Sequence, residues 1–288
     1  RFENYKQQPL EFVFDKSFTG KLSQFGLDPN RRTPSGIKAA IIREKGTNGE
    51  REMAYMLYLA GFDVKDVTMT DLISGRETLE DINMVVYCGG FSNSDVLGSA
   101  KGWAGSFLFN PKAKAALDNF YAREDTLSLG VCNGCQLMME LGLITPEDKK
   151  KGKMLHNDSH KFESAFLGVT VPMNRSVMFG SLSGSKLGIW VAHGEGKFSL
   201  PYPEDHYNVV LKYSYDEYPG NPNGSDYSVA GIASQDGRHL AMMPHLERAC
   251  FPWENAYYPL DRKNEDQITP WMEAFVNARK WVEANRKK

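Results

Sequence analysis

One stretch decides the fold: Gly130-Val131-Cys132-Asn133-Gly134-Cys135-Gln136. The apolar run 127–129 before it predicts a short buried strand, and residues 137–141 after it predict the start of a helix. A cysteine with glycines two positions before and two after it, at a strand-to-helix turn, is the thiol form of the nucleophile elbow. The glycines let the chain reverse sharply, and the N-terminus of a helix favours a thiolate over a thiol. We therefore expect Cys132 to be a reactive sulfur.

The spacing of Cys132 and Cys135 also fits other chemistry. A C-x-x-C pair can be a redox dithiol or half of a zinc site. Zinc needs about four ligands, whereas the sequence has no second C-x-x-C or C-x-x-H, and Cys88 and Cys250 stand alone. A redox pair also suits a helix N-terminus, and two inert buried thiols are a third interpretation. On these residues alone, all three interpretations stay open.

Composition narrows the class of protein. The chain of 288 residues can bury a large core, and its formal net charge of −2 gives no electrostatic reason to expect nucleic acid or membrane as a partner. No apolar run reaches membrane-spanning length, and no signal-peptide pattern opens the chain. Four cysteines without a disulfide-like framework favour a cytoplasmic location. Because the chain starts with Arg1 instead of Met, we expect it to be cut from a longer protein.

The pattern of apolar residues predicts an α/β fold. Strands at 37–42, 62–67 and 84–88 alternate with helices at 48–60 and 113–121, which implies a parallel sheet covered on both faces. Later segments predict strands with few helices between them, at 166–171, 187–192, 208–213 and 240–243. One amphipathic helix at 270–281 closes the chain. The expected architecture is a doubly wound, mostly parallel sheet with an antiparallel extension.

The first 36 residues differ from the rest. They are polar, and the stretch 28–36 is typical of a linker. The segment Leu10–Phe14 is too apolar to stay solvated, so we expect it to pack as a strand or an extended strap. The predicted division is a preceding tail and linker at 1–36 and one domain at 37–288.

A cysteine nucleophile needs a general base and a group that orients this base. His245 follows the predicted strand at 240–243, at the edge where ligands bind in open α/β sheets. Glu247 lies two positions further, which in extended backbone places both side chains on one face. Glu247 could then fix the imidazole tautomer and leave the other nitrogen for Cys132.

Two glycine-rich clusters follow other predicted strands. Gly89-Gly90 suits an oxyanion hole built from the Gly90 amide and the amide after the nucleophile, Asn133, although an ordinary glycine turn would look the same. The segment His193-Gly194-Glu195-Gly196 lacks the spacing of either common phosphate loop and could be a plain loop.

Together these motifs resemble the class I glutamine amidotransferases, which have a flavodoxin-like fold. Within that class the chain is similar to the glutaminase part of the phosphoribosylformylglycinamidine synthases of purine biosynthesis. The resemblance runs from about residue 37 to the C-terminus and rests on 43–49, 89–92, 95–98, 102–104, 130–136, 157–159, 162–163, 193–196, 221–225 and 242–245. Asn93-Ser94 stand where the family commonly has Tyr-Gly.

The resemblance implies a Cys-His-Glu triad of Cys132, His245 and Glu247. It implies hydrolysis of L-glutamine to glutamate and ammonia through a glutamyl thioester, with Gln136, His193 and Glu195 helping to hold glutamine. Ammonia would pass to a synthetase portion of the same polypeptide, absent here, that uses ATP and magnesium to convert formylglycinamide ribonucleotide to formylglycinamidine ribonucleotide. No metal or cofactor is expected in this domain. A thiol-redox protein and an inactive regulatory domain of the same fold are the alternatives.

Overall fold

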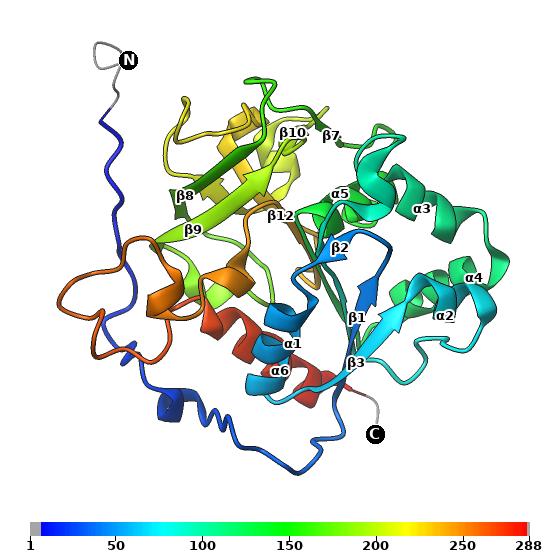
Figure 1. Ribbon diagram of the computed structural model, residues 1–288, viewed down its shortest axis with the longest axis horizontal. Helices are drawn as coiled ribbons and strands as arrows, with labels where there is room; N and C mark the ends of the chain where they lie inside the picture. Colours follow the sequence, from blue (N-terminus) through cyan, green and yellow to red (C-terminus); the bar gives the residue numbers. More distant parts are fainter. Residues whose placement is uncertain (1–6, 287–288) are drawn as a thin grey trace.

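The central sheet has a parallel half, as the sequence predicts. In the computed structural model, which describes residues 7–286, five strands run parallel in the order β3-β1-β4-β6-β13. Strands β3 and β1 of this half lie side by side in Figure 1. Their bounds are β1 (Lys38–Arg43), β3 (Asp63–Thr68), β4 (Met84–Tyr87), β6 (Leu127–Val131) and β13 (His239–Met242). Ile41, Val86 and Leu129 lie side by side in this register and are buried, which explains the apolar runs.

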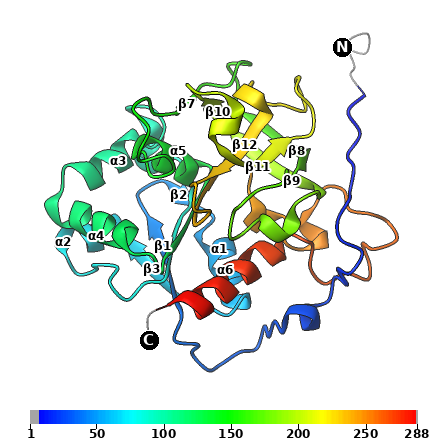
Figure 2. The same cartoon turned by 180° about the vertical axis from the view of Figure 1, so that it is seen from behind.

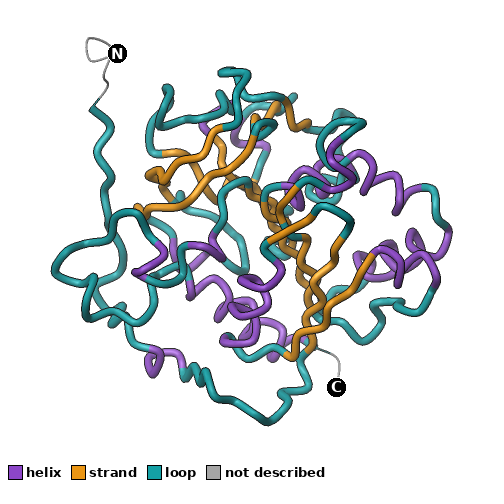
Figure 3. Tube along the Cα trace, viewed as in Figure 1, coloured by secondary structure: helices purple, strands orange, loops and turns teal. Residues whose placement is uncertain are grey.

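Helices cover both faces of this half, as expected for a doubly wound sheet (Figure 3). One layer holds α1 (Glu50–Leu59) and α6 (Met272–Asn285), which contact each other. The other layer holds α2 (Met69–Ser74), α3 (Lys101–Leu108), α4 (Pro111–Ala122) and α5 (Asn133–Glu140). The predicted doubly wound α/β class is therefore confirmed.

The second half of the sheet is antiparallel. It continues from β13 through β12 (Val229–Ala233), β11 (Asn208–Tyr213), β8 (Glu163–Thr170) and β9 (Lys186–His193), giving nine strands among residues 7–286. Strand β12 was not predicted, because its five residues are all buried and carry no alternation of polar and apolar side chains.

Two short ribbons stand outside the main sheet. Strand β2 (Thr47–Asn48) pairs with β5 (Gly89–Gly90), and β7 (Lys153–Leu155) pairs with β10 (Lys197–Ser199). Strand β5 directly follows β4, and β10 follows the turn at 194–196 that ends β9. Each ribbon therefore fixes the loop that follows a strand of the main sheet.

The segment before β1 runs along the outside of the molecule (Figure 1, Figure 2). Val13 exchanges two backbone hydrogen bonds with Lys186, at 2.8 and 2.7 Å, and the Phe12 ring contacts the rings of Tyr257 and Tyr258. The expected strap is confirmed, while the domain division at residue 36 stays a prediction.

None of the helices within residues 7–286 has both the length and the apolar character that a membrane span requires.

Candidate active site

Cys132 lies in the turn between β6 and α5. Its φ of 53° and ψ of −109° are unusual for a residue with a side chain, and its N–H donates to the Met242 carbonyl at 2.9 Å. The flanking glycines are required by close packing. A Cβ at Gly134 would lie 2.0 Å from the Tyr87 carbonyl oxygen, and one at Gly130 would lie 2.5 Å from the Gly134 carbonyl oxygen. The turn therefore has the geometry of a nucleophile elbow.

His245 and Glu247 form a buried pair after β13. The His245 Nδ1 donates to the Glu247 Oε1 at 2.7 Å, and the two residues are 2% and 1% exposed. The backbone differs from the predicted extended form, since residues 246–248 form a 3₁₀ turn. That turn brings Glu247 back under the imidazole, while the His245 N–H donates to the Trp190 carbonyl at 2.9 Å. Nε2 is the ring nitrogen left for Cys132.

Gly89 shows how close the cysteine and the histidine are. A Cβ on Gly89 would lie 2.9 Å from His245 Cε1 and 3.4 Å from Cys132 Cβ, so both side chains flank one point. Burial opposes the imidazolium form, but the Glu247 carboxylate and the Cys132 sulfur outweigh it and raise the pKa of His245. The Cys132 thiol also lies 3.6 Å from the Ala192 carbonyl oxygen. The structure thus brings the three triad candidates together.

The two oxyanion-hole candidates lie in elements that contact each other, Gly90 in β5 and Asn133 at the start of α5. Gly90 has a φ of +114°, and a Cβ there would lie 2.6 Å from the Gly46 carbonyl oxygen, so only glycine fits the ribbon. Asn133 is the first residue of α5, where an amide has no partner within the helix. Its Oδ1 accepts the Ser92 N–H at 3.0 Å, which ties the helix start to the glycine turn.

The loop after this turn keeps a left-handed backbone without glycine. Asn93, Ser94 and Asp95 have φ values of 51°, 56° and 49°. The Asp95 Oδ1 accepts the Ala100 N–H at 3.2 Å and the Asn133 amide at 3.3 Å, which supports this backbone. Burial raises the pKa of Asp95, and the negative charge of Glu195 raises it further.

The three residues expected to hold glutamine lie around the turn after β9. Gln136 is bonded on both sides: its Oε1 accepts from Asn133 at 2.8 Å, and its Nε2 donates to the Glu195 carbonyl at 2.8 Å. The Glu195 side chain is 24% exposed. His193 is 2% exposed, and neither ring nitrogen has a hydrogen-bond partner within the described part of the chain. Burial, helped by the charge of His245, lowers the pKa of His193 to about 4, so its ring is neutral at pH 7.

The remaining cysteines lie inside the core. Cys88, Cys135 and Cys250 are at most 1% exposed and, like Cys132, are free thiols. Burial, and secondarily the neighbouring Cys132, raise the pKa of the Cys135 thiol. Over residues 7–286, no three His, Cys, Asp or Glu side chains are arranged to hold a metal ion.

Comparison with known proteins identifies the family. The sequence profile described as "CobB/CobQ-like glutamine amidotransferase domain" matches residues 36–282. The chain belongs to this family. Two relatives are 44% identical to this glutamine amidotransferase domain: the probable phosphoribosylformylglycinamidine synthase, chloroplastic/mitochondrial, of Arabidopsis thaliana and the phosphoribosylformylglycinamidine synthase of Homo sapiens. The matches cover 86% and 87% of the chain but 19% and 21% of the relatives, so the chain spans about a fifth of their length.

Solved structures agree with the class of fold. A chain in the structure of PurLQS from Thermotoga maritima has a TM-score of 0.60 at 26% identity, over 86% of this amidotransferase domain and 98% of that chain. A putative GMP synthase protein from Thermoplasma acidophilum has a TM-score of 0.56 at 16% identity, over 88% and 96% of the two chains. This second likeness shows the fold alone.

Sequence reasoning gave no role to several residues that shape this site. Asn157 and Asn223 occur in the motifs of the resemblance, yet nothing in the sequence says what their side chains bond to. Both are fully buried and bond to the turn at 193–196. The sequence carries no signal for these contacts, because the burial that obliges each side chain to find hydrogen-bond partners is visible only in the fold.

Proposed function

We propose that this chain is the glutaminase part of a phosphoribosylformylglycinamidine synthase and that it hydrolyses L-glutamine through Cys132, His245 and Glu247. The observation that carries the proposal is the arrangement at Gly89, where the cysteine and a histidine paired with a glutamate flank one point at the edge of the sheet. The names of the relatives support the choice of the larger enzyme.

In the first half-reaction, the Cys132 thiol gives its proton to His245, and the sulfur attacks the side-chain carbonyl carbon of glutamine. The carbon–nitrogen bond breaks as His245 donates its proton to the leaving nitrogen. Ammonia leaves, and a glutamyl thioester on Cys132 remains. In the second half-reaction, His245 takes a proton from water, hydroxide attacks the thioester, and the proton returns to the sulfur as glutamate leaves.

The surrounding groups supply charge and orientation. The Glu247 carboxylate holds Nδ1–H and stabilises the imidazolium, in line with the raised pKa of His245. The amides of Gly90 and Asn133 are the proposed donors to the developing oxyanion. The Glu195 side chain is partly exposed and offers a negative charge suited to the α-ammonium group of glutamine. Gln136 and His193 serve the same pocket, with the Gln136 amide engaged in holding its wall.

In the complete enzyme, ammonia would pass to the synthetase portion, which uses ATP to convert formylglycinamide ribonucleotide. A cytoplasmic location stays a prediction, because the plant relative is named chloroplastic/mitochondrial. A redox role for Cys132 and Cys135 has less support, because Cys135 is fully buried and its pKa is raised.

The test uses the full-length protein with ATP and formylglycinamide ribonucleotide. Cys132→Ala should abolish synthesis supported by glutamine and leave synthesis supported by added ammonium salts close to wild type, because the synthetase site needs only the product of the glutaminase. If glutamine-dependent synthesis survives in Cys132→Ala, the proposed function is wrong.

A further inference from the structure

The turn after β9 is held on one side by the side chain of Asn157. This residue lies between β7 and β8 and is 0% exposed. Its Nδ2 donates to the His193 carbonyl at 2.7 Å, its Oδ1 accepts the Gly196 N–H at 3.0 Å, and its own N–H donates to the Gly194 carbonyl at 2.8 Å. One asparagine thus bonds to both ends and the middle of the turn.

Asn223 holds the same turn from a different segment, between β11 and β12. It is also 0% exposed, and its Nδ2 donates to the Gly196 carbonyl at 2.7 Å. Its Oδ1 accepts from the Ser225 N–H at 3.0 Å and the Ser225 hydroxyl at 2.7 Å. The Asn223 carbonyl accepts the Asp158 N–H at 3.2 Å, which joins the two asparagine segments.

The third attachment comes from the nucleophile helix. Gln136, four residues after Cys132, donates to the Glu195 carbonyl at 2.8 Å, and Asn133 orients that amide. The turn is therefore bonded at each of its four residues, through the neutral side-chain amides of Asn157, Asn223 and Gln136 and one backbone bond. Such amides fix a backbone without adding a charge next to the imidazole of His245.

The turn also has little freedom to shift. A Cβ at Gly196 would lie 2.5 Å from the Nδ1 of His193, so the histidine ring fills the inside of the turn. The backbone of His193 and Gly194 continues directly from Ala192, whose carbonyl contacts the Cys132 sulfur. A displacement of the turn would therefore move the wall that faces the nucleophile.

We propose that Asn157 and Asn223 are positioning residues, which hold the 193–196 turn in the geometry that binds glutamine beside Cys132. This inference rests on the proposed glutaminase function. Neither asparagine belongs to the triad, so their loss should weaken glutamine binding and leave the reactivity of Cys132 toward a small reagent intact.

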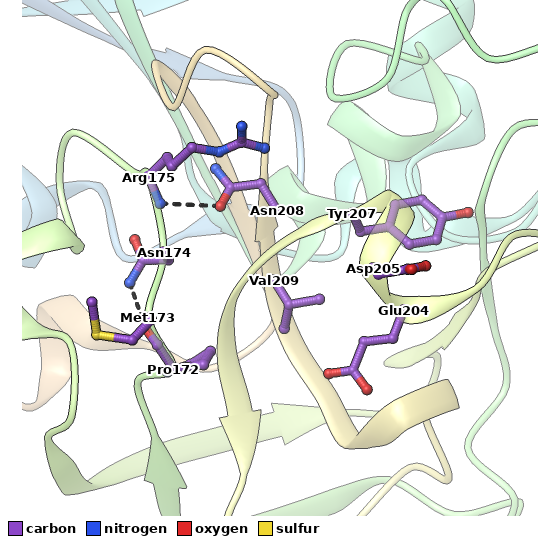
Figure 4. Close-up of a pocket in the computed structure, with 9 residues that line it drawn as sticks. All are labelled: Pro172, Met173, Asn174, Arg175, Glu204, Asp205, Tyr207, Asn208 and Val209. Carbon is purple, nitrogen blue, oxygen red and sulfur yellow. Dashed lines mark hydrogen bonds between the residues drawn. The ribbon is translucent and has the colours of Figure 1, made fainter.

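The test compares Asn157→Ala and Asn223→Ala with Asn208→Ala in the full-length protein. Asn208 is a matched control, since it is 6% exposed, accepts from the Arg175 N–H at 3.2 Å and donates to the Ser234 carbonyl at 3.1 Å. It lies in a pocket at the start of β11 (Figure 4). Asn223, by contrast, bonds to the hydroxyl of Tyr213 at the other end of that strand. All three variants should lower the melting temperature.

Asn157→Ala and Asn223→Ala should raise the KM for glutamine about tenfold or more, as expected when a buried hydrogen-bonding group is lost. Their kcat at saturating glutamine and their rate of inactivation by iodoacetamide should change much less. Asn208→Ala should keep the wild-type KM. Should Asn157→Ala fail to fold, Asn157→Ser and Asn223→Ala carry the same expectation.

Folded variants with the wild-type KM, or with the same kinetic change as Asn208→Ala, would contradict the positioning role. An iodoacetamide reaction slowed as much as glutamine turnover would also contradict it, because the defect would then lie in the triad. If the wild-type protein itself does not release glutamate from glutamine, the proposed function fails, and this inference with it.

Discussion

Gly89 lies beside two members of the candidate triad, where a side chain would meet both of them. Its φ is not in the left-handed region, so alanine would meet no backbone strain there, only the His245 ring at 2.9 Å and Cys132 at 3.4 Å. We expect Gly89→Ala to push the imidazole away from the sulfur and lower kcat/KM for glutamine by about a hundredfold, the usual scale for a displacement near 1 Å. Steady-state glutamate release measures this.

Gly180→Ala is the matched control, because a Cβ at Gly180 meets nothing within 4 Å and its φ is also not positive. It should keep wild-type activity. Equal activity of the two variants would mean that the space around Gly89 does not hold the triad.

The Glu247 carboxylate should govern the pH dependence. It helps to raise the pKa of His245, so the imidazolium that protonates the leaving nitrogen persists to higher pH than an ordinary histidine would allow. Glu247→Gln keeps a hydrogen-bond acceptor but removes the charge. We expect lower kcat/KM and an alkaline limb of the pH–rate profile shifted to lower pH. A profile with an unmoved alkaline limb would show that Glu247 does not set this pKa.

Some site residues could be predicted from the sequence, whereas their backbone conformation and contacts could not. Cys132, His245 and Glu247 could be singled out because each follows a predicted strand, and parallel strands end at one edge of a sheet. The backbone of the pair was predicted wrongly as extended, since a 3₁₀ turn of three residues leaves no periodic signal. The contacts of Asn157 and Asn223 could not be predicted, because they join segments that only the folded antiparallel strands bring together.

At the scale of elements, the site depends on how closely α5 approaches the sheet. Strands β4 and β6 are neighbours, and Gly134 in the first turn of α5 lies against the Tyr87 carbonyl at the end of β4. The sequence predicted this strand-turn-helix unit from its glycines and apolar runs. The helix was predicted to start at residue 137, whereas α5 begins at Asn133, because Asn133 and Gly134 are weak helix formers.

Gly134→Ala tests this approach. Alanine is the better helix former, yet its Cβ would lie 2.0 Å from a backbone oxygen, so we expect the free energy of unfolding to fall by about 2 kcal/mol or more. Urea denaturation measures the change. In α3, Gly105→Ala is a helical control whose Cβ would meet only Phe109 at 3.7 Å, and it should be neutral or stabilising. A stable Gly134→Ala variant would contradict the close packing of helix and strand.

At the scale of the whole molecule, the N-terminal strap joins parts of the chain that are far apart in sequence. Phe18 is 3% exposed, and its ring contacts Phe14 and Phe25 while the Arg262 guanidinium lies 5.5 Å from it. The apolar character of residues 10–14 was enough to predict that this segment packs. Which loops it packs against depends on the tertiary fold.

Phe18→Ala should therefore lower the free energy of unfolding by about 3 kcal/mol, as for other buried aromatic side chains. Val13→Ala, in the same segment before β1 but 52% exposed, should change it by less than about 0.5 kcal/mol. Thermal or chemical denaturation of both variants measures the difference. If Phe18→Ala is as stable as Val13→Ala, the segment before β1 is not part of the folded core.

The central claim is that Cys132 carries the glutamyl group. The most direct measurement is peptide mass spectrometry on full-length protein quenched in acid during turnover of glutamine, with Cys132→Ala and Cys135→Ala treated alike. We expect one glutamyl group on the peptide of Cys132 in the wild type and in Cys135→Ala, and none in Cys132→Ala. A glutamyl group on Cys135, or glutamate release at the wild-type rate by Cys132→Ala, would contradict it.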